Sequence, residues 1–230
     1  RVLSGHTGWV STCVFSPDGS TLATASYDNT IRLWNTRNGD ERAVLQGHQA
    51  FVSSCAFSAD GRMLVSAGDD LTVRLWDLRY LKEIVVLQKN SWKTENKRSK
   101  NYSAVHTCAI SPNGKYLAYA NWDDIITLWY IPPRYEVAKL VGHSDKVLTC
   151  DFSPDGRTLA TGSKDNTIRF WDIPSGKCKG VAVGHQSWVN DCVYAPDGRM
   201  LASASNDLTV RLWKTRRGKE KAVLQGHTGW

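Results

Sequence analysis

The chain has 230 residues, of which 41% are hydrophobic, 22% charged and 10% aromatic, with a formal net charge of +7. This composition is typical of a globular protein and excludes disordered and fibrous classes. The longest uninterrupted aliphatic run, Ile84 to Leu87, is far shorter than the roughly 20 apolar residues of a membrane helix, and the first residues lack a signal-peptide pattern, so we expect no membrane span and no secretory leader.

The first predicted elements are four short strands joined by tight turns. Val10 to Phe15 and Leu22 to Ala25 are apolar runs on either side of Ser16-Pro17-Asp18-Gly19, a β-turn in which proline presets φ at the second position. Thr30 to Trp34 follows another tight turn, and Ala43 to Leu45 leads into the next Gly-His pair. Helical periodicity is too short anywhere in the sequence to compete with this interpretation.

The same elements recur along the chain with a period of 42 residues. The spacing from the histidine of Gly-His to the tryptophan that ends the third strand is 28 in every repeat that has both, and one repeat carries an 11-residue insertion. A fixed period in this range indicates a repeat architecture. We expect one segment, 1–230, with a basic insertion at 88–98 and repeats at about 5–46, 47–87, 99–141, 142–183 and 184–225.

The recurring Gly-His, the Pro-Asp-Gly turn and the Trp-Asp of Trp76-Asp77 and Trp171-Asp172 resemble the WD-repeat family of β-propellers. The resemblance covers essentially the whole chain. It implies an all-β fold with four-stranded antiparallel blades around a central channel. Propellers of this family usually have seven blades, and Arg1 to Trp9 agrees with Ala222 to Trp230 at seven of nine positions. We therefore expect five repeats of a larger propeller with seven or more blades.

Each repeat carries a histidine, a serine or threonine and an aspartate, a combination that also occurs in nucleophilic triads. An enzyme needs one such constellation in one cleft, whereas this chain has four complete sets at identical spacing, each tied to a tryptophan. The resemblance implies a structural hydrogen-bond chain from Trp through Ser/Thr and His to Asp in each blade. The four sets are His6, Thr24, Asp28 and Trp34; His48, Ser66, Asp70 and Trp76; His143, Thr161, Asp165 and Trp171; and His185, Ser203, Asp207 and Trp213.

Repeat 3 departs from this pattern, because Asn101 replaces the histidine and Tyr119 the hydroxyl residue. We expect its blade to depend more on packing and to be the most labile. Elsewhere the sequence has no phosphate-cradling glycine loop and no set with metal-ligand spacing. We predict no catalytic residue, no cofactor, no metal and no enzymatic activity.

Five cysteines occupy one equivalent position in the first strand of each repeat, seven residues after the Gly-His slot. Equivalent positions in neighbouring blades lie about 10 Å apart, beyond the reach of a disulfide. We predict reduced core residues and an intracellular protein, cytoplasmic or nuclear. The five are Cys13, Cys55, Cys108, Cys150 and Cys192, and Cys178 lies off the pattern.

The resemblance also implies that two sets of loops line one rim of the channel and supply the usual contact positions. Five large aromatic residues fall there, namely Trp9, Tyr27, Phe51, Trp122 and Trp188. Tryptophan and tyrosine are enriched in binding hot spots, which favours a surface for proteins or peptides. The alternative is that several of these rings pack against neighbouring loops to close the channel. The other predicted contact residues are Asp69, His106, Lys146, Leu148, Lys164, Asn190 and Asn206.

The positive charge is concentrated in two segments. Gln88 to Lys100 has a net charge of +4 and Arg211 to Lys221 of +5, so the remainder of the chain is slightly acidic. The family's topology places these segments on opposite rims, where they do not form one continuous track. Basic patches can hold nucleic acid or acidic lipid through phosphate contacts, but such a run is more often a solvated loop. Nucleic acid is therefore not the favoured partner.

The segment from Leu64 to Arg79 resembles the docking box by which some WD-repeat proteins engage the damage-binding adaptor of cullin ubiquitin ligases. The match rests on Asp70, Asp77 and Arg79. Because this pattern overlaps with the ordinary repeat, the alternative is a turn aspartate beside a solvated arginine.

Together these features predict a non-catalytic scaffold that binds partner proteins or peptides through its aromatic rim, with a role as ubiquitin-ligase substrate adaptor as a narrower hypothesis. Two alternatives remain open: a propeller that reads phosphate groups through the basic insertion, and a purely structural segment of a large assembly.

Overall fold

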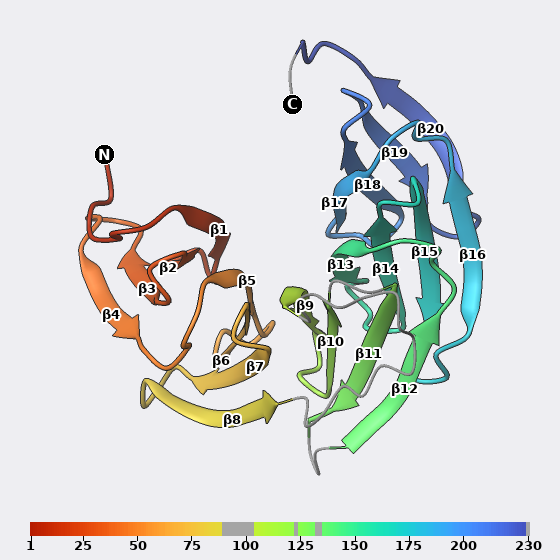
Figure 1. The fold of residues 1–230 in the computed structure, drawn as a ribbon. Helices are drawn as coiled ribbons and strands as arrows, with labels where there is room; N and C mark the ends of the chain where they lie inside the picture. Colours follow the sequence, from red (N-terminus) through yellow and green to blue (C-terminus); the bar gives the residue numbers. More distant parts are fainter. Residues whose placement is uncertain (89–103, 122–123, 132–134, 229–230) are drawn as a thin grey trace. The chain divides into compact units, whose positions relative to one another are not determined.

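A computed structural model describes residues 1–88, 104–121, 124–131 and 135–228, and every regular element in these ranges is a β-strand. The strands form five four-stranded sheets (Figure 1), which we number 1 to 5 in chain order. The predicted all-β fold with four-stranded antiparallel sheets is thereby confirmed. Within the described ranges, no helix is long and apolar enough to cross a membrane.

Residues Arg1–Cys108 form a first compact unit, which we call unit 1. It contains most of β9 (Val105–Ile110), the first strand of sheet 3. Sheet 1 consists of β1 (Val10–Phe15), β2 (Thr21–Ser26), β3 (Ile31–Asn35) and β4 (Glu41–Leu45). Sheet 2 consists of β5 (Val52–Phe57), β6 (Met63–Gly68), β7 (Thr72–Asp77) and β8 (Lys82–Gln88).

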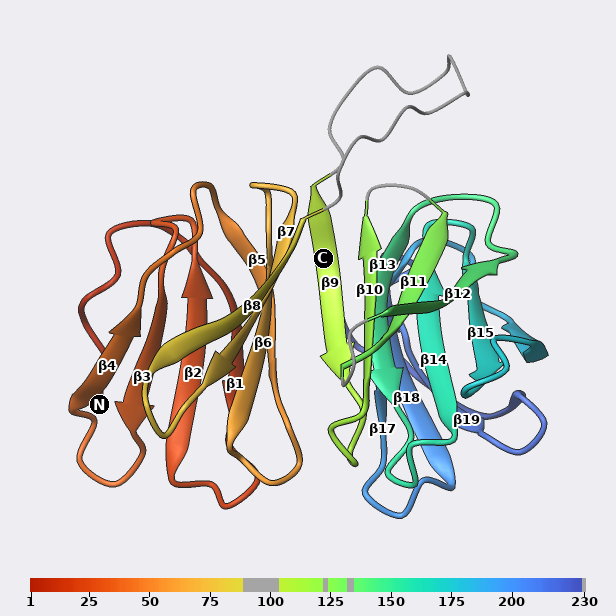
Figure 2. The same ribbon diagram turned by 90° about the horizontal axis from the view of Figure 1, so that it is seen from below.

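Residues Ala109–Trp230 form a second compact unit, unit 2. Figure 2 shows most strands of each unit running up and down in the view, as in an antiparallel meander, while the outer strands β8 and β12 slant across it. Sheet 3 continues with β10 (Tyr116–Asn121), β11 (Ile125–Tyr130) and β12 (Tyr135–Val141). Sheet 4 consists of β13 (Val147–Phe152), β14 (Thr158–Ser163), β15 (Thr167–Asp172) and β16 (Cys178–Val183). Sheet 5 consists of β17 (Val189–Tyr194), β18 (Met200–Ser205), β19 (Val210–Lys214) and β20 (Lys219–Leu224).

The turn between the first two strands of each sheet is built by an aspartate or asparagine followed by glycine. In sheet 1 the Gly19 amide donates to the Ser16 carbonyl at 2.8 Å, and the Ser16 hydroxyl donates to the Asp18 carboxylate at 2.6 Å. Gly19 has φ of 68°, a conformation that only glycine adopts without steric cost. The same turn recurs in all five sheets, with Gly61, Gly114, Gly156 and Gly198 at φ of 67–68°. Each turn fixes the hairpin register that follows.

The core lies between neighbouring sheets of the same unit. In unit 1, Val52, Cys55 and Trp76 of sheet 2 are buried against sheet 1, where Ile31 and Leu45 cover them. In unit 2, sheets 3 and 4 bury a corresponding cluster, as do sheets 4 and 5. Burial of this apolar area is the main source of stability, because each sheet alone would leave both faces in water.

One expectation about the cysteines is wrong. Cys55, Cys108, Cys150 and Cys192 are buried, but Cys13 is exposed. The described residues of unit 1 include no sheet packed on the face of sheet 1 that carries Cys13, and its neighbour Phe15 is 62% exposed there. Equivalent positions in the repeat therefore differ in burial because the neighbouring sheet, not the strand itself, provides the cover.

Candidate functional site

A chain of three side-chain hydrogen bonds lies inside sheet 4. The Trp171 indole N–H donates to Thr161 Oγ1 at 2.9 Å, and Thr161 Oγ1 lies 2.8 Å from His143 Nε2. His143 Nδ1 lies 2.7 Å from Asp165 Oδ2. Every donor has an acceptor if the threonine hydroxyl donates to Nε2 and the imidazole is neutral with its proton on Nδ1. The arrangement thus uses all its hydrogen-bonding groups internally.

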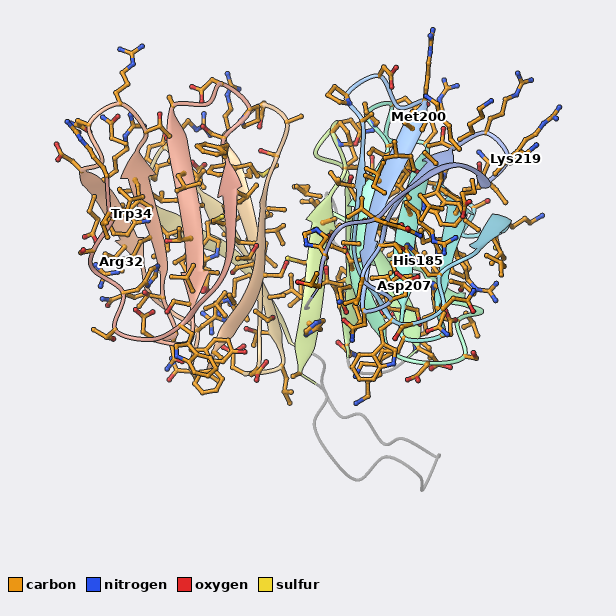
Figure 3. All side chains as sticks on the ribbon, turned by 90° about the horizontal axis from the view of Figure 1, so that it is seen from above. Arg32, Trp34, His185, Met200, Asp207 and Lys219 are labelled. Atoms are coloured by element: carbon orange, nitrogen blue, oxygen red, sulfur yellow. The ribbon has the colours of Figure 1, made fainter. Side chains whose placement is uncertain are left out.

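Sheets 1, 2 and 5 contain the same chain. The Trp Nε1 to hydroxyl distances are 2.8–2.9 Å, the hydroxyl to His Nε2 distances 2.7–2.8 Å, and the His Nδ1 to Asp distances 2.8–3.0 Å. Figure 3 shows His185 beside Asp207 in sheet 5, and Trp34 in sheet 1. The complete chains are His6–Thr24–Asp28–Trp34, His48–Ser66–Asp70–Trp76 and His185–Ser203–Asp207–Trp213.

The aspartates of these chains are held in the charged form. Burial raises the pKa of each carboxyl, but the hydrogen bonds that it accepts outweigh burial and hold the pKa well below its usual value. Burial lowers the pKa of His185, which agrees with a neutral imidazole. A nucleophilic serine or threonine would need a hydroxyl facing a substrate, whereas Ser66 and Thr161 are fully buried and bonded to tryptophan.

Sheet 3 differs from the other four sheets. The Trp129 indole N–H is buried and has no hydrogen-bond partner among the described residues. Tyr119 occupies the position of the hydroxyl residue and is 8% exposed. The predicted replacement at Asn101 lies outside the described residues. The tryptophan of this sheet is therefore held by packing.

Three aromatic side chains of the predicted rim stack on one another in unit 1. Trp9 and Tyr27 have ring centroids 5.9 Å apart, and Tyr27 and Phe51 are stacked at 4.5 Å with planes 5° apart. Backbone hydrogen bonds fix the order, because the Tyr27 amide donates to the Trp9 carbonyl and the Asp69 amide to the Phe51 carbonyl. Trp9 is 81% exposed, Tyr27 41% and Phe51 44%. We call Trp9, Tyr27 and Phe51 the aromatic ladder.

The predicted rim residues of unit 2 form a different surface. The Lys164 ammonium lies 3.6 Å from the centroid of the Trp188 ring, a cation–π contact that covers part of the one predicted rim aromatic residue of unit 2 within the described ranges. The Asn190 amide donates to Asn206, while Lys146 and Leu148 are half-buried. This set is basic and polar rather than aromatic.

Two further rim predictions stand apart from these surfaces. His106 is half-buried within β9, and Trp122 lies outside the described residues. Asp69 follows the aromatic ladder and its side chain is exposed. The surrounding protein still removes part of the water around its carboxylate, which raises its pKa, and the neighbouring Asp70 carboxylate adds a smaller contribution.

The three residues of the predicted docking box fall into two groups. The Asp70 carboxylate is bound by His48, by the Gln49 amide and by Thr72, so it belongs to the interior of sheet 2. Arg79 donates to Asp77 at 3.1 Å and lies 5.4 Å from the Tyr80 ring, with its side chain 59% exposed. Asp77 and Arg79 thus form a pair in which the arginine is exposed, whereas Asp70 is bonded within sheet 2.

Five antiparallel four-stranded sheets, four of which contain an internal tryptophan-to-aspartate hydrogen-bond chain, define a β-repeat protein. Among the described residues, no group of three or more histidine, cysteine, aspartate or glutamate side chains could hold a metal ion. The family described as WD domain, G-beta repeat matches residues 1–35, 39–77, 95–130, 134–172 and 176–214. The chain belongs to this family.

Several known proteins are similar to parts of the chain. Apoptotic protease-activating factor 1 of Mus musculus is 29% identical over 143 residues, which are 62% of this chain and 10% of that protein. The U5 small nuclear ribonucleoprotein 40 kDa protein of Homo sapiens is 59% identical over 34 residues, 15% of this chain and 10% of that protein. Protein HIR1 of Mycosarcoma maydis is 47% identical over 45 residues, 19% of this chain and 4% of that protein. The chain thus spans a tenth or less of the length of these relatives.

Proposed function

We propose that the protein is a non-catalytic scaffold that binds a partner protein or peptide through the aromatic ladder of unit 1. The observation that carries this proposal is the exposure of three stacked rings, with Trp9 only one-fifth covered. A contiguous aromatic surface of this kind is unfavourable in water and is typical of an interaction site.

The ladder is also ordered before a partner arrives. Tyr27 and Phe51 are stacked face to face, and both are anchored next to backbone hydrogen bonds between loops. Fixing rings in advance reduces the entropy that binding must overcome, so more of the buried area contributes to affinity. The name of the U5 small nuclear ribonucleoprotein 40 kDa protein places that relative in an assembly, which supports membership of a larger complex here.

The narrower adaptor hypothesis rests on Arg79. Its guanidinium is oriented by Asp77 and by the Tyr80 ring, yet its side chain remains more than half exposed. An ordered, exposed arginine is a favourable contact for an acidic partner. Phosphate reading through the insertion concerns residues outside the described ranges, and an intracellular location stays a prediction from the six free thiols.

The test is native affinity purification of the full chain with cross-linking and mass spectrometry of bound proteins. Trp9→Ala and Phe51→Ala should each abolish binding of the same set of partners, because each removes the ring at one end of the ladder. Tyr135→Ala is the matched control, since Tyr135 is 52% exposed but lies outside the ladder. Arg79→Ala should abolish binding of an adaptor protein and leave the other partners bound. If the ladder variants and the control retain the same partners, the proposal is wrong.

A further inference from the structure

Unit 2 has a groove between sheets 4 and 5, with a volume of 840 Å³. It lies at the ends of the strands opposite to the histidine–aspartate end. Figure 3 shows Met200, which lines the groove, at the far end of sheet 5 from His185 and Asp207. Phe170, Tyr194 and Met200 provide apolar surface, and five cations line the groove beside them: Lys179, Arg199, Lys214, Arg216 and Arg217.

Unit 1 has the corresponding groove between sheets 1 and 2, with a volume of 600 Å³. Its lining residues occupy the same positions of the repeat. Leu33 corresponds to Phe170, Phe57 to Tyr194 and Arg79 to Arg216. Comparison of the two grooves therefore separates what the repeat requires from what is special to unit 2.

The first difference is the hydroxyl of Tyr194. Sheets 2 and 4 have phenylalanine at this position, Phe57 and Phe152. Tyr194 is 7% exposed, and its hydroxyl is buried without a hydrogen-bond partner among the described residues. Burial of an unpaired hydroxyl is unfavourable, and phenylalanine would fill the same space without that cost. A ligand atom in the groove would supply the missing partner.

The second difference is the charge near Arg216. In unit 1 the matching Arg79 is paired with Asp77, whereas Lys214 stands at the position of that aspartate in unit 2. In the described part of the chain, no carboxylate pairs with the side chains of Lys214, Arg216 or Arg217. The side chains of these three cations are exposed, so water screens their mutual repulsion, but together they create a local positive potential that attracts an anion.

The remaining differences keep this groove open and basic. A Cβ atom on Gly180, which replaces Ala43 of unit 1, would meet no atom within 4 Å. Two carboxylates, Asp155 and Asp197, also line the groove. Asp155 accepts from the Ser153 hydroxyl and the Arg157 amide, and Asp197 accepts from the Arg199 amide. Among the described residues, neither forms an ion pair with a cation of the 214–217 loop. Lys179 is paired with Asp172 at 3.5 Å. Within the described ranges, the groove cations without an ion pair are thus Arg199 and the three cations of the 214–217 loop.

We propose that this groove binds a small organic phosphate of nucleotide size, with its phosphates on Lys214, Arg216 and Arg217. Its flat apolar part lies against Phe170 and Met200, and a polar atom of that part bonds the Tyr194 hydroxyl. The volume lies within the range of small-molecule sites, about 300 to 1,000 Å³. A small molecule is favoured over an acidic peptide because the unpaired hydroxyl is buried between two sheets, where an extended chain does not reach. The inference is independent of the aromatic ladder.

The test is calorimetric titration of the full chain with ATP, with inorganic tripolyphosphate and with a glutamate oligomer, at physiological salt. ATP should bind more tightly than tripolyphosphate, because only ATP uses the apolar surface. Lys214→Asp introduces the residue found at the equivalent positions 77 and 172, and it should lower the affinity for ATP by about tenfold or more. Tyr194→Phe should lower the affinity for ATP by about fivefold and leave the affinity for tripolyphosphate unchanged.

Both substitutions place a residue that the fold already accepts at the same position of another sheet, so folding is retained and is checked by circular dichroism. Arg62→Ala in the groove of unit 1 is the matched control, because Arg62 occupies the position of Arg199 there, and it should leave ATP binding unchanged. Absence of ATP binding would overturn the proposal. Equal affinities for ATP and tripolyphosphate would also overturn it, because they would show that the groove binds anions through charge alone. A higher affinity for the glutamate oligomer would overturn it as well, because the groove would then be a site for an acidic peptide.

Discussion

Sheets 3 and 4 have the same strand order and equivalent registers, but only sheet 4 contains a complete hydrogen-bond chain. Leu117 pairs with Trp129 in sheet 3 as Leu159 pairs with Trp171 in sheet 4. The Trp171 indole donates to Thr161, whereas the Trp129 indole N–H has no partner among the described residues. The apolar pattern and the turns therefore suffice to specify the sheet, and the polar chain is not required for its topology.

The polar chain instead determines how firmly a sheet is held. The four groups of a complete chain satisfy one another and, through the aspartate, tie the Gly-His loop to the turn between the second and third strands. Asp165 accepts from the Ser144 amide at 3.0 Å and from the Thr167 amide at 2.9 Å. Buried networks of this kind add rigidity when every member is satisfied and are costly when one member is missing. The three predictions that follow test this difference.

The largest effect is expected from Asp165→Ala. Its carboxylate is 6% exposed and accepts four hydrogen bonds, from His143, Ser144 and twice from Thr167. Their loss leaves buried donors unpaired and should lower the free energy of unfolding by roughly 3 kcal/mol or more in urea denaturation. Asp155→Ala is the control, because Asp155 is an exposed turn aspartate of the same sheet, and it should cost about 1 kcal/mol. Equal losses of stability in the two variants would show that the hydrogen-bond chain stabilises sheet 4 no more than an ordinary turn does.

Much of the fold followed from the sequence because the signals are local. The Pro-Asp-Gly turns and the tryptophan spacing fix the hairpins, and the structure has glycine at positive φ in each of these turns. The stacking of Trp9, Tyr27 and Phe51 could be anticipated only in part. Spacing places these residues in adjacent loops, but ring distances depend on side-chain rotamers that a sequence pattern does not determine.

The features that the sequence did not reveal depend on neighbouring sheets. Cys13 and Cys55 are equivalent in the repeat but differ in burial, because sheet 1 covers Cys55 and no described sheet of unit 1 covers Cys13. The groove of unit 2 is lined by two repeats and combines Tyr194 with the 214–217 loop. The signal available in the sequence is the departure of Tyr194 and Lys214 from the residues at equivalent positions of other repeats, Phe57 and Phe152 in the one case and Asp77 and Asp172 in the other.

A smaller effect is expected from replacing the tryptophans by phenylalanine. Trp171→Phe removes the donor to Thr161 and disturbs a complete chain, so the free energy of unfolding should fall by about 2 kcal/mol. Trp129→Phe removes an indole N–H that is buried without a partner among the described residues, and the loss should be about 1 kcal/mol smaller. The two variants lose the same ring area, so the difference between them in urea denaturation isolates the hydrogen bond. A larger loss for Trp129→Phe would contradict the comparison.

The smallest effect is expected in local stability and its dependence on pH, measured by native-state amide exchange corrected for intrinsic rates. At pH 7 the amides of β14 should be better protected than those of β10, because the complete hydrogen-bond chain makes local opening of sheet 4 less favourable. Hydrogen bonds lower the pKa of Asp165 below its ordinary value of 3.8 despite burial, so the folded state binds fewer protons than the unfolded state in acid. The stabilisation by Asp165 is therefore complete above about pH 5 and declines as the pH falls through 3.8 towards the lower folded value. The protection of β14 should approach that of β10 over this range, whereas equal protection at pH 7, or a gap that does not change with pH, would show that packing alone holds both sheets.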